Sequence, residues 1–228
     1  MPESIVLLSG GMDSSTVLAI AKSKGHDVVA LTFDYGQRHR RELESAMKVA
    51  AKIGVKEHII IPLDLGKYLR SALTQRGMHV PQGRSEEEIG SGIPDTYVPS
   101  RNIIFLSIAS SIAESRGAGN VFIAVNAVDF SGYPDCTPEF LDAFGNVMSV
   151  GTKAGREGAP IKIEAPLLKM SKAEIVKEAV RLGVPLELTW SCYLGGKKAC
   201  GRCDSCKLRL KGFEQAGIKD PIEYEVRT

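Results

Sequence analysis

The chain has 228 residues, of which 43% are hydrophobic and 25% are charged, and its formal net charge is +2. These values are ordinary for a soluble globular protein with one main domain and a sizeable core. The small basic excess disfavours a dedicated nucleic-acid surface, so we expect small-molecule ligands and no stable nucleic-acid partner. No apolar run approaches the ~20 residues that a membrane helix needs, and no signal-peptide pattern is visible. We therefore expect no membrane association and a cytoplasmic location.

The first chemical motif is a polar turn between a strand-like and a helix-like segment. Ile5–Leu8 predicts a buried strand, and apolar periodicity from Thr16 predicts a helix. Leu8 is followed by Ser9, Gly10, Gly11, Met12, Asp13, Ser14 and Ser15. The glycines permit a sharp turn, while the N–H groups of the helix start and the serine hydroxyls suit an oxyanion. This pattern predicts a phosphate-binding turn.

The residue sequence of this turn matches neither a Walker A motif nor a G-x-G-x-x-G fingerprint. No Lys follows the second glycine, and Asp13 lies where it would repel a bare phosphate. An acid is reasonable there if Mg2+ joins the carboxylate to a triphosphate. The alternative is an ordinary turn in which Asp13 is a favourable first-turn acid. The string S-G-G-x-D-S resembles the PP-loop of ATP pyrophosphatases, which bind ATP and release pyrophosphate.

Strand-like and helix-like segments alternate after this turn. Strands are predicted at Val28–Phe33, His58–Pro62, Asn120–Asn126 and Ile161–Ala165. Helices are predicted at Glu42–Ile53 before Gly54, at 101–115 between a Ser100 cap and Gly117, from a Ser171–Glu174 capping box to Gly183, and near Lys207–Gln215. The alternation predicts an α/β fold with a doubly wound, mostly parallel five-stranded sheet.

The stretch 63–99 lacks such periodicity and is rich in Gly, Pro and charged residues. A structureless stretch of this length inside a compact domain is typical of a lid, here centred on 75–98. The alternative is a plain surface insertion.

Four of the five cysteines are close in sequence: Cys192, Cys200, Cys203 and Cys206. Four thiolates can close a tetrahedral Zn2+ site of the structural kind. The spacing of the last three also occurs in iron–sulfur proteins, so a cluster is an alternative, and unliganded thiols are another. Disulfides are disfavoured because the cytoplasm keeps thiols reduced. We therefore expect an ATP-binding α/β domain at 1–185 and a small zinc lobe at 186–228.

Besides the PP-loop and the cysteines, the chain has four further sequence motifs: Tyr35–His39, Val98–Asn102, Asp129–Cys136 and Thr189–Cys192. Together these strings resemble the 7-cyano-7-deazaguanine synthase family, and the resemblance runs from Ile5 to about Cys206. It implies a fold like that of the adenine nucleotide α-hydrolases. It also implies an ATP-dependent ligase of queuosine biosynthesis that turns 7-carboxy-7-deazaguanine and ammonia into a nitrile.

The implied reaction activates oxygen twice. Adenylation of the carboxylate lets ammonia form an amide, and a second adenylation on the amide oxygen lets AMP leave to give the nitrile. The turn at Ser9–Ser15 would stabilise the departing pyrophosphate, with Asp13 as a candidate Mg2+ ligand. The implied cofactors are ATP, Mg2+ and Zn2+, and the implied small-molecule partners are a deazapurine and ammonia. We also expect a homodimer.

Four cations near predicted element ends are candidates for binding anions. A cation in the first turn opposes the helix dipole, so Arg101 predicts a phosphate or carboxylate ligand, or else a surface ion pair. Lys169, beside Ser171, is a candidate for the charge that develops on the α-phosphate, or a solvated connector lysine. Arg38 and His39 follow a strand end and are candidates for binding phosphate or substrate carboxylate, or else solvated loop residues.

The loop 129–136 holds the candidates for binding the deazapurine. Asp129 or Asp135 would read the base, because a carboxylate accepts paired hydrogen bonds from a guanine-like N1–H and 2-amino group. Phe130 and Tyr133 are candidates for stacking on the heterocycle, or are packing residues. Cys136 is disfavoured as a nucleophile, since adenylation already activates the carboxylate.

Two other function classes remain open. Another PP-loop enzyme, such as a tRNA-thiolating enzyme, would share the turn. It would also need an RNA-binding surface and reactive cysteines, whereas only Cys136 lies outside the cysteine group. The second class is a zinc-containing regulator that binds ATP without consuming it. Asp13 disfavours it, because a metal-ligating acid suits pyrophosphate departure more than retention.

Overall fold

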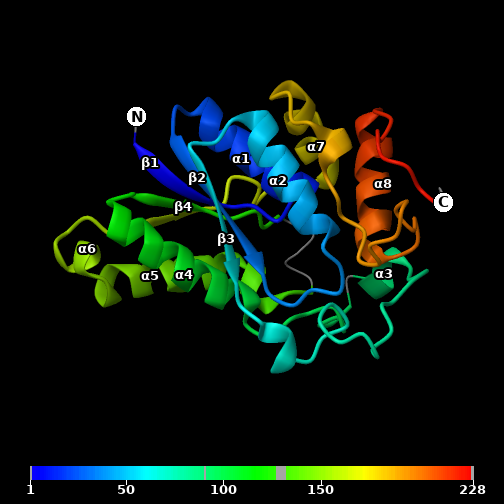
Figure 1. Ribbon diagram of the computed structural model, residues 1–228, viewed down its shortest axis with the longest axis horizontal. Coiled ribbons are helices and arrows are strands. Elements are labelled where there is room, and N and C mark those ends of the chain that lie inside the picture. The colour runs from blue at the N-terminus through cyan, green and yellow to red at the C-terminus, as the bar shows by residue number, and fades with distance from the viewer. Residues whose placement is uncertain (1, 90, 127–131, 227–228) are drawn as a thin grey trace.

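The protein is a parallel-sheet structure, seen here in a computed structural model that describes residues 2–89, 91–126 and 132–226 (Figure 1). Within these ranges five parallel strands form one sheet in the order β3-β2-β1-β4-β5. The strands are β1 (Glu3–Leu7), β2 (Asp27–Asp34), β3 (Glu57–Pro62), β4 (Asn120–Phe122) and β5 (Lys162–Glu164). The predicted α/β fold with a five-stranded parallel sheet is confirmed.

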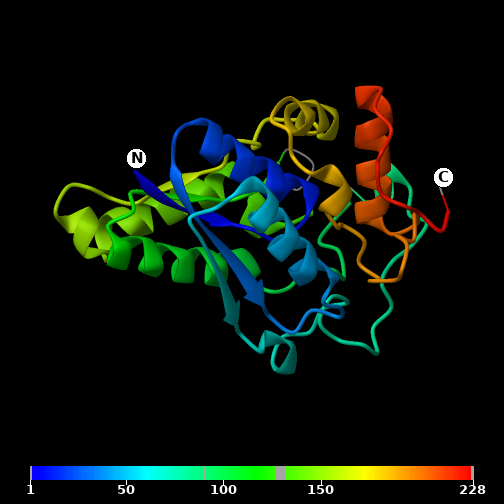
Figure 2. The same cartoon turned by 45° about the horizontal axis from the view of Figure 1, so that its top comes forward.

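Helices cover both faces of this sheet. They are α1 (Met12–Ser23), α2 (Arg41–Ile53), α3 (Glu86–Ile89), α4 (Arg101–Arg116), α5 (Pro138–Gly151), α6 (Lys153–Arg156), α7 (Lys172–Arg181) and α8 (Asp204–Ala216). Helices α1, α2 and α7 lie on one face, and α4 and α5 lie on the other (Figures 1 and 2). No helix in the described ranges is long and apolar enough to cross a membrane.

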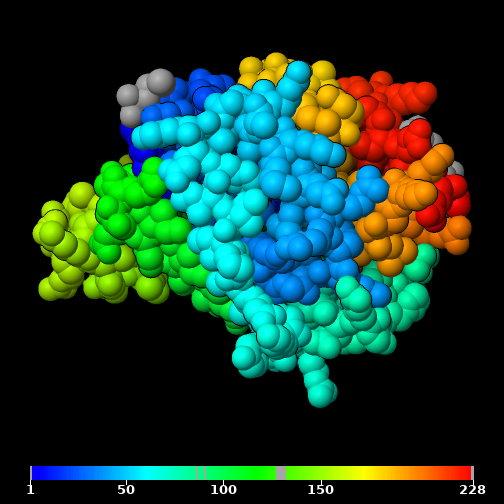
Figure 3. Space-filling model, in the orientation of Figure 1, coloured from blue at the N-terminus to red at the C-terminus, as the bar shows by residue number. Residues whose placement is uncertain are grey.

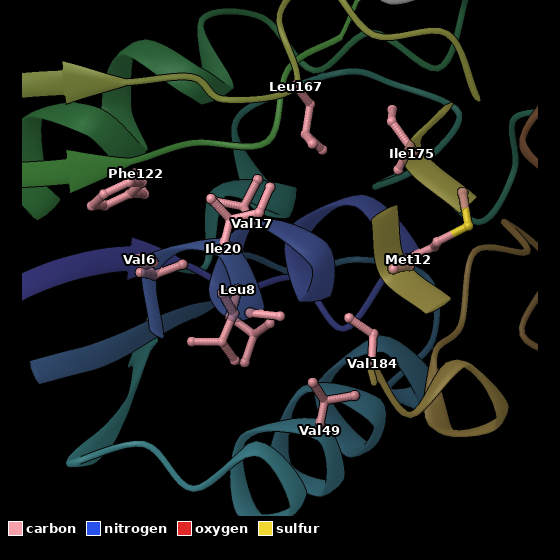
Figure 4. Packing of buried hydrophobic residues seen from close by; sticks show 14 of the residues in the cluster. Val6, Leu8, Met12, Val17, Ile20, Val49, Phe122, Leu167, Ile175 and Val184 are labelled. Atoms are coloured by element: carbon pink, nitrogen blue, oxygen red, sulfur yellow. The ribbon is translucent and has the colours of Figure 1, made fainter. Parts of the chain in front are cut away.

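The first strand shows why two helix layers are needed. Val6 packs into the core on the α1 side, whereas Ile5 and Leu7 pack into the core on the α4 side. Such strands bury both faces, as a parallel sheet between helices requires. Figure 4 shows Val6 near Val17 of α1 in the first of these cores. Each fully buried aliphatic side chain contributes about 1.5–3 kcal/mol, so these cores hold the strand ends in place.

Most predicted boundaries agree with the structure. Gly54 and Gly117 take left-handed conformations directly after α2 and α4. The predicted capping box opens α7, with both hydrogen bonds between Ser171 and Glu174 formed. Strand β4 ends at Phe122, earlier than predicted, because its pairing with both neighbouring strands ends there.

The prediction that Ser100 caps α4 is wrong. Ser100 has a φ of 56°, and its side chain makes no capping hydrogen bond. Instead the Asp135 carboxylate accepts a hydrogen bond of 2.9 Å from the Asn102 backbone N–H. The Asn102 side chain in turn donates to the Asp135 carbonyl at 3.0 Å. The cap comes from a distant part of the chain, so no local pattern could indicate it.

The sequence predicts no helix between 137 and 160, yet α5 and α6 lie there. The Thr137 hydroxyl accepts a hydrogen bond from the Phe140 N–H at 3.1 Å, and Pro138 occupies the first turn of α5. Both residues are helix-start signals that were available in the sequence. Gly145 inside α5 weakens the helical pattern.

A buried ion pair anchors the C-terminal part of the chain. Helix α8 packs against α7 (Figure 1), and its Phe213 belongs to the core on the α1 side. Arg209 Nε and Asp220 Oδ2 are 2.8 Å apart, and their side chains are 2% and 1% exposed. Arg209 also donates to the Thr189 hydroxyl at 2.7 Å, and the Tyr224 hydroxyl donates to Asp220 at 2.6 Å. The pair thus connects α8 to segments before and after it.

The segment 63–99 folds against the loop that carries the cysteines (Figure 3). Gln82 pairs with Cys203 in an antiparallel bridge. Arg84 forms an ion pair with Asp204, and Lys207 donates to the Arg84 carbonyl. Although the sequence shows no periodicity here, these contacts give the middle of the segment a defined place beside α8.

We expect Asp220→Ala to lower the free energy of unfolding by about 3–5 kcal/mol, because it leaves the Arg209 charge buried without its partner. Denaturant unfolding followed by circular dichroism measures the change. Glu223→Ala is the matched control, since Glu223 pairs with Lys198 at 3.3 Å where both side chains are more than half exposed. The control should change stability by less than about 1 kcal/mol, and equal losses in both variants would contradict the anchoring role.

Candidate active site

The turn between β1 and α1 lies at the carboxyl edge of the sheet, where open α/β folds bind ligands. Gly10 has a φ of 82°, and a Cβ there would lie 2.6 Å from the Ala46 nitrogen and overlap the Glu42 carbonyl. The Gly10 carbonyl accepts a hydrogen bond from the Trp190 N–H at 2.9 Å. Glycine is therefore required both by the backbone angle and by the close packing of the turn on α2.

The serine hydroxyls of the turn mainly shape its own backbone. Ser14 Oγ accepts a hydrogen bond from the Ser9 N–H at 3.1 Å, and Ser15 Oγ donates to the Gly11 carbonyl at 2.8 Å. Ser15 is fully buried, whereas Ser9 is exposed. The donors that remain for an anion are the N–H groups at the start of α1, which have no partner within the helix.

Asp13 is held by two side chains from other parts of the fold. Lys172, the first residue of α7, lies 2.6 Å from Asp13 Oδ2, and Asn126 Nδ2 donates to the same oxygen at 3.0 Å. The side chains of Lys172 and Asp13 are only 14% and 20% exposed. A cation and an acid thus lie together at the phosphate turn.

Two cavities share the turn as a wall. The first has a volume of about 230 Å3 and the second about 210 Å3. Both are lined by Ser9, Ser14, Glu42, Arg101, Ala124 and Tyr193. The second cavity adds Asp13 and Lys172, together with Ser191 and Arg209 from the C-terminal part. The turn between β1 and α1 therefore faces two spaces.

The first cavity has apolar and aromatic walls. The rings of Phe33 and Phe105 stack with centroids 4.0 Å apart and an interplanar angle of 12°. Leu31, Tyr35 and Tyr133 also line the cavity. Such walls suit a flat heterocycle, because aromatic faces and aliphatic side chains pack against both of its sides.

Opposite charges line both cavities without forming an ion pair. Arg101, the first residue of α4, stacks its guanidinium carbon 5.9 Å from the Tyr35 ring centroid. No carboxylate in the described part of the chain pairs with it. Glu42 lies in the first turn of α2, and burial raises the pKa of its carboxyl to about 7. Arg101 thus lines both cavities without a carboxylate partner among the described residues.

Arg38 contacts the segment 63–99, whereas His39 contacts the C-terminal part of the chain. The Arg38 guanidinium donates to the carbonyls of Ala72 and Met78 at 3.0 and 2.8 Å, which holds the segment 63–99. His39 packs against Gly195, and burial lowers the pKa of its imidazole. Both residues line a small third cavity beside Glu42.

The other predicted site residues have varied positions. Tyr133 lines the first cavity, and its hydroxyl lies 2.8 Å from that of Thr96. Asp135 is buried with its carboxylate on the Asn102 N–H, and it does not line either of the larger cavities. Lys169 is exposed and lines neither. Asp129 and Phe130, which the sequence also predicts as site residues, lie outside the described residues.

The sequence analysis missed Lys172, Glu42 and Arg209 as site residues. Lys172 follows the capping serine of α7, so its place at the helix start was visible, but its contact with Asp13 was not. Glu42 and Arg209 lie inside helices, where charged residues are usually solvated. No local signal distinguishes them.

The four clustered cysteines form a candidate metal centre. Their sulfur atoms all lie within 4.8 Å of one another, and all four residues are buried. Backbone N–H groups donate to Cys192 Sγ from Leu194 and Cys200, and to Cys200 Sγ from Arg202 and Cys203, at 3.3–3.4 Å. Such donors stabilise thiolates, which are the metal-binding form of cysteine.

We expect Cys203→Ser to abolish metal binding and to lower the melting temperature by about 10 °C, because it removes one of the four clustered thiols through which a metal would stabilise the folded state. Elemental analysis and differential scanning calorimetry measure the two effects. Cys136→Ser is the matched control, since Cys136 is also buried but lies outside the cluster. A stable, metal-free Cys203→Ser protein would contradict a structural metal.

The chain is similar to known proteins over nearly its whole length. Residues 3–217 match the family model described as "Queuosine biosynthesis protein QueC". A 7-cyano-7-deazaguanine synthase of Acetivibrio thermocellus is 54% identical over the whole of both chains. One from Nostoc punctiforme is 52% identical over 97% of this chain and 99% of its own.

Among solved structures, the NMN synthetase of Francisella tularensis is similar in fold. Its TM-score is 0.52 at 15% identity, and the match covers 96% of this chain and 78% of that one. At this identity the likeness concerns the fold alone. The family match and the two relatives, in contrast, cover nearly the whole chain at about half identity. The chain therefore belongs to the QueC family of queuosine biosynthesis proteins, the family of the 7-cyano-7-deazaguanine synthases.

Proposed function

We propose that this chain is an ATP-dependent ligase that converts 7-carboxy-7-deazaguanine and ammonia into 7-cyano-7-deazaguanine, with release of AMP and pyrophosphate. The observation that carries the proposal is the phosphate turn, which two cavities share. Lys172 forms an ion pair with Asp13 in the second cavity. Arg101, which has no carboxylate partner among the described residues, lines both cavities. Adenylation needs this combination, because the nucleotide and the acid must meet at one phosphorus. The names of the relatives support the choice of substrate.

ATP suits the site as follows. The N–H groups at the start of α1 take the phosphates, and the two cavities that share the turn take the adenine and the deazapurine, one in each. Lys172 and Arg101 then face the anionic groups, where they neutralise charge that develops as pyrophosphate leaves. Leu8 and Met12 are buried beneath the turn and hold it in place.

Asp13 suits a Mg2+ ion. Its contacts with Lys172 and Asn126 both use Oδ2, so Oδ1 is available to a hard cation. When bound beside Asp13, Mg2+ would neutralise negative charge on the triphosphate.

Zinc suits the cysteine cluster better than an iron–sulfur cluster. A tetrahedral site with Zn–S bonds of about 2.3 Å places its sulfurs about 3.8 Å apart. Cys200 Sγ and Cys206 Sγ are 3.9 Å apart, and every pair lies within 4.8 Å. A cluster of several irons would need a wider cage. Four thiolates leave no open position, so the zinc is structural.

Recognition of the deazapurine is assigned to the loop 129–136 and to the segment at Arg38 and His39. Tyr133 supports this assignment, because it lines the first cavity. Asp129 and Asp135 both stay candidates for reading the base, and Phe130 stays a candidate for stacking on it.

The proposal includes a cytoplasmic homodimer. Thiols are kept reduced in the cytoplasm, and none of the five cysteines forms a disulfide in the structure. Helices α4 and α5 carry exposed apolar side chains that a second copy would cover, among them Ile103, Val147 and Val150. Light scattering on the purified protein tests the dimer.

Mass spectrometry of the products tests the activity. We expect the nitrile, AMP and pyrophosphate when the protein is mixed with Mg-ATP, ammonium and 7-carboxy-7-deazaguanine, and no AMP in a control without the deazapurine. AMP without nitrile would point to another acceptor. Unchanged ATP in every mixture would contradict the proposal and favour an ATP-binding regulator.

Two lysine variants test which cation serves the phosphates. We expect Lys172→Met to lower kcat/KM for ATP by about 100-fold, because a buried charge beside the turn is lost. Lys169→Met should stay within about twofold of the wild type, since Lys169 is exposed. ATP–pyrophosphate exchange is the measurement. A larger loss for Lys169→Met would contradict our assignment and support the prediction made from the sequence.

A further inference from the structure

Glu42 is the one carboxylate among the described residues that lines the first cavity, and it also lines the second. The other acid of the second cavity, Asp13, is engaged by Lys172 and Asn126. The Glu42 carboxylate takes part in none of the hydrogen bonds or ion pairs of the described residues, Arg101 included. A half-buried acid and a half-buried cation thus line the same two cavities without forming an ion pair with each other.

A charged carboxylate in this position lowers the stability of the fold unless a ligand of opposite charge binds to it. Removing a charge from water is unfavourable, and the nearby Arg101 charge only partly offsets the effect of burial on Glu42. The backbone around Glu42 is fixed by the fold, because its carbonyl lies against Gly10 of the phosphate turn. The start of its side chain is therefore held beside the phosphate turn, and Glu42 lines both cavities.

We propose that Glu42 is a catalytic residue that binds ammonium and takes its proton as the nitrogen attacks the adenylated acid. The inference rests on the proposed function. Arg101 binds the anionic phosphate of the same intermediate, so the two unpaired charges each receive an opposite partner when the reactants are bound.

The step balances as follows. Ammonium transfers one proton to a Glu42 carboxylate oxygen, and the freed lone pair forms the C–N bond to the acyl carbon. The C–O bond to AMP breaks, and AMP leaves with that electron pair. The nitrogen then gives a second proton to water, and Glu42 returns its proton to solvent. Amide, AMP and two protons are the products.

The surroundings of Glu42 suit a proton acceptor at neutral pH. Burial raises the pKa of its carboxyl to about 7, and the Arg101 charge opposes that rise. A base is most effective when its pKa lies near the working pH. Tyr35 and Tyr193 line the same cavity, so aromatic faces for a cation are also close.

The test separates adenylation from attack by nitrogen. ATP–pyrophosphate exchange with 7-carboxy-7-deazaguanine and no ammonium measures adenylation, and amide plus nitrile formation at limiting ammonium measures attack. We expect Glu42→Gln to keep exchange within about threefold, and to lose about 100-fold in kcat/KM for ammonium. Glu44→Gln is the matched control, because Glu44 is exposed in the same first turn of α2. It should equal the wild type in both assays.

Hydroxylamine gives the decisive comparison. It carries a free lone pair at neutral pH and needs no base, so Glu42→Gln should form the hydroxamate at nearly the wild-type rate. Equal losses with hydroxylamine and ammonium, wild-type use of ammonium, or loss of exchange in Glu42→Gln would each overturn the role of Glu42. No exchange in the wild type would overturn the proposed function, and this inference with it.

Discussion

The close approach of the Gly10 backbone to the first turn of α2 is the constraint on which the site depends. A side chain at Gly10 would overlap the Glu42 carbonyl, so the turn can lie there only with a glycine in a left-handed conformation. This contact places Glu42 beside the phosphate turn. On its other side the turn is held by the Trp190 N–H, which links it to the residues before the metal centre. One backbone position thus connects three parts of the chain.

The site keeps charges that the rest of the fold would neutralise. Elsewhere, buried charges are paired, as in Arg209 with Asp220. At the turn, Arg101 and Glu42 face the cavities without ion-pair partners among the described residues. Unpaired buried charges destabilise a fold, and the two hydrophobic cores on either side of the sheet offset that cost. Such an arrangement is typical of a preorganised active site.

The C-terminal part of the chain shapes the second cavity instead of forming an isolated appendage. Arg209 lines that cavity while its guanidinium is fixed by Asp220 and Thr189. The cysteine loop also receives the segment 63–99 through the Gln82 bridge and the Arg84–Asp204 pair. A metal at the cysteines therefore stabilises contacts that extend to one wall of the site.

The sequence by itself determined the strand–helix alternation, the phosphate turn, the α7 capping box and the cysteine cluster. Each of these depends on residues that are near in sequence, so local spacing carries the information. Three contacts were decided only by the tertiary structure: the ion pair of Lys172 with Asp13, the close approach of Glu42 to Gly10, and the hydrogen bond from the start of α4 to Asp135. These contacts join residues from different elements. Their partners are set by how the sheet brings loop ends together, and no local pattern of charge or polarity encodes that packing.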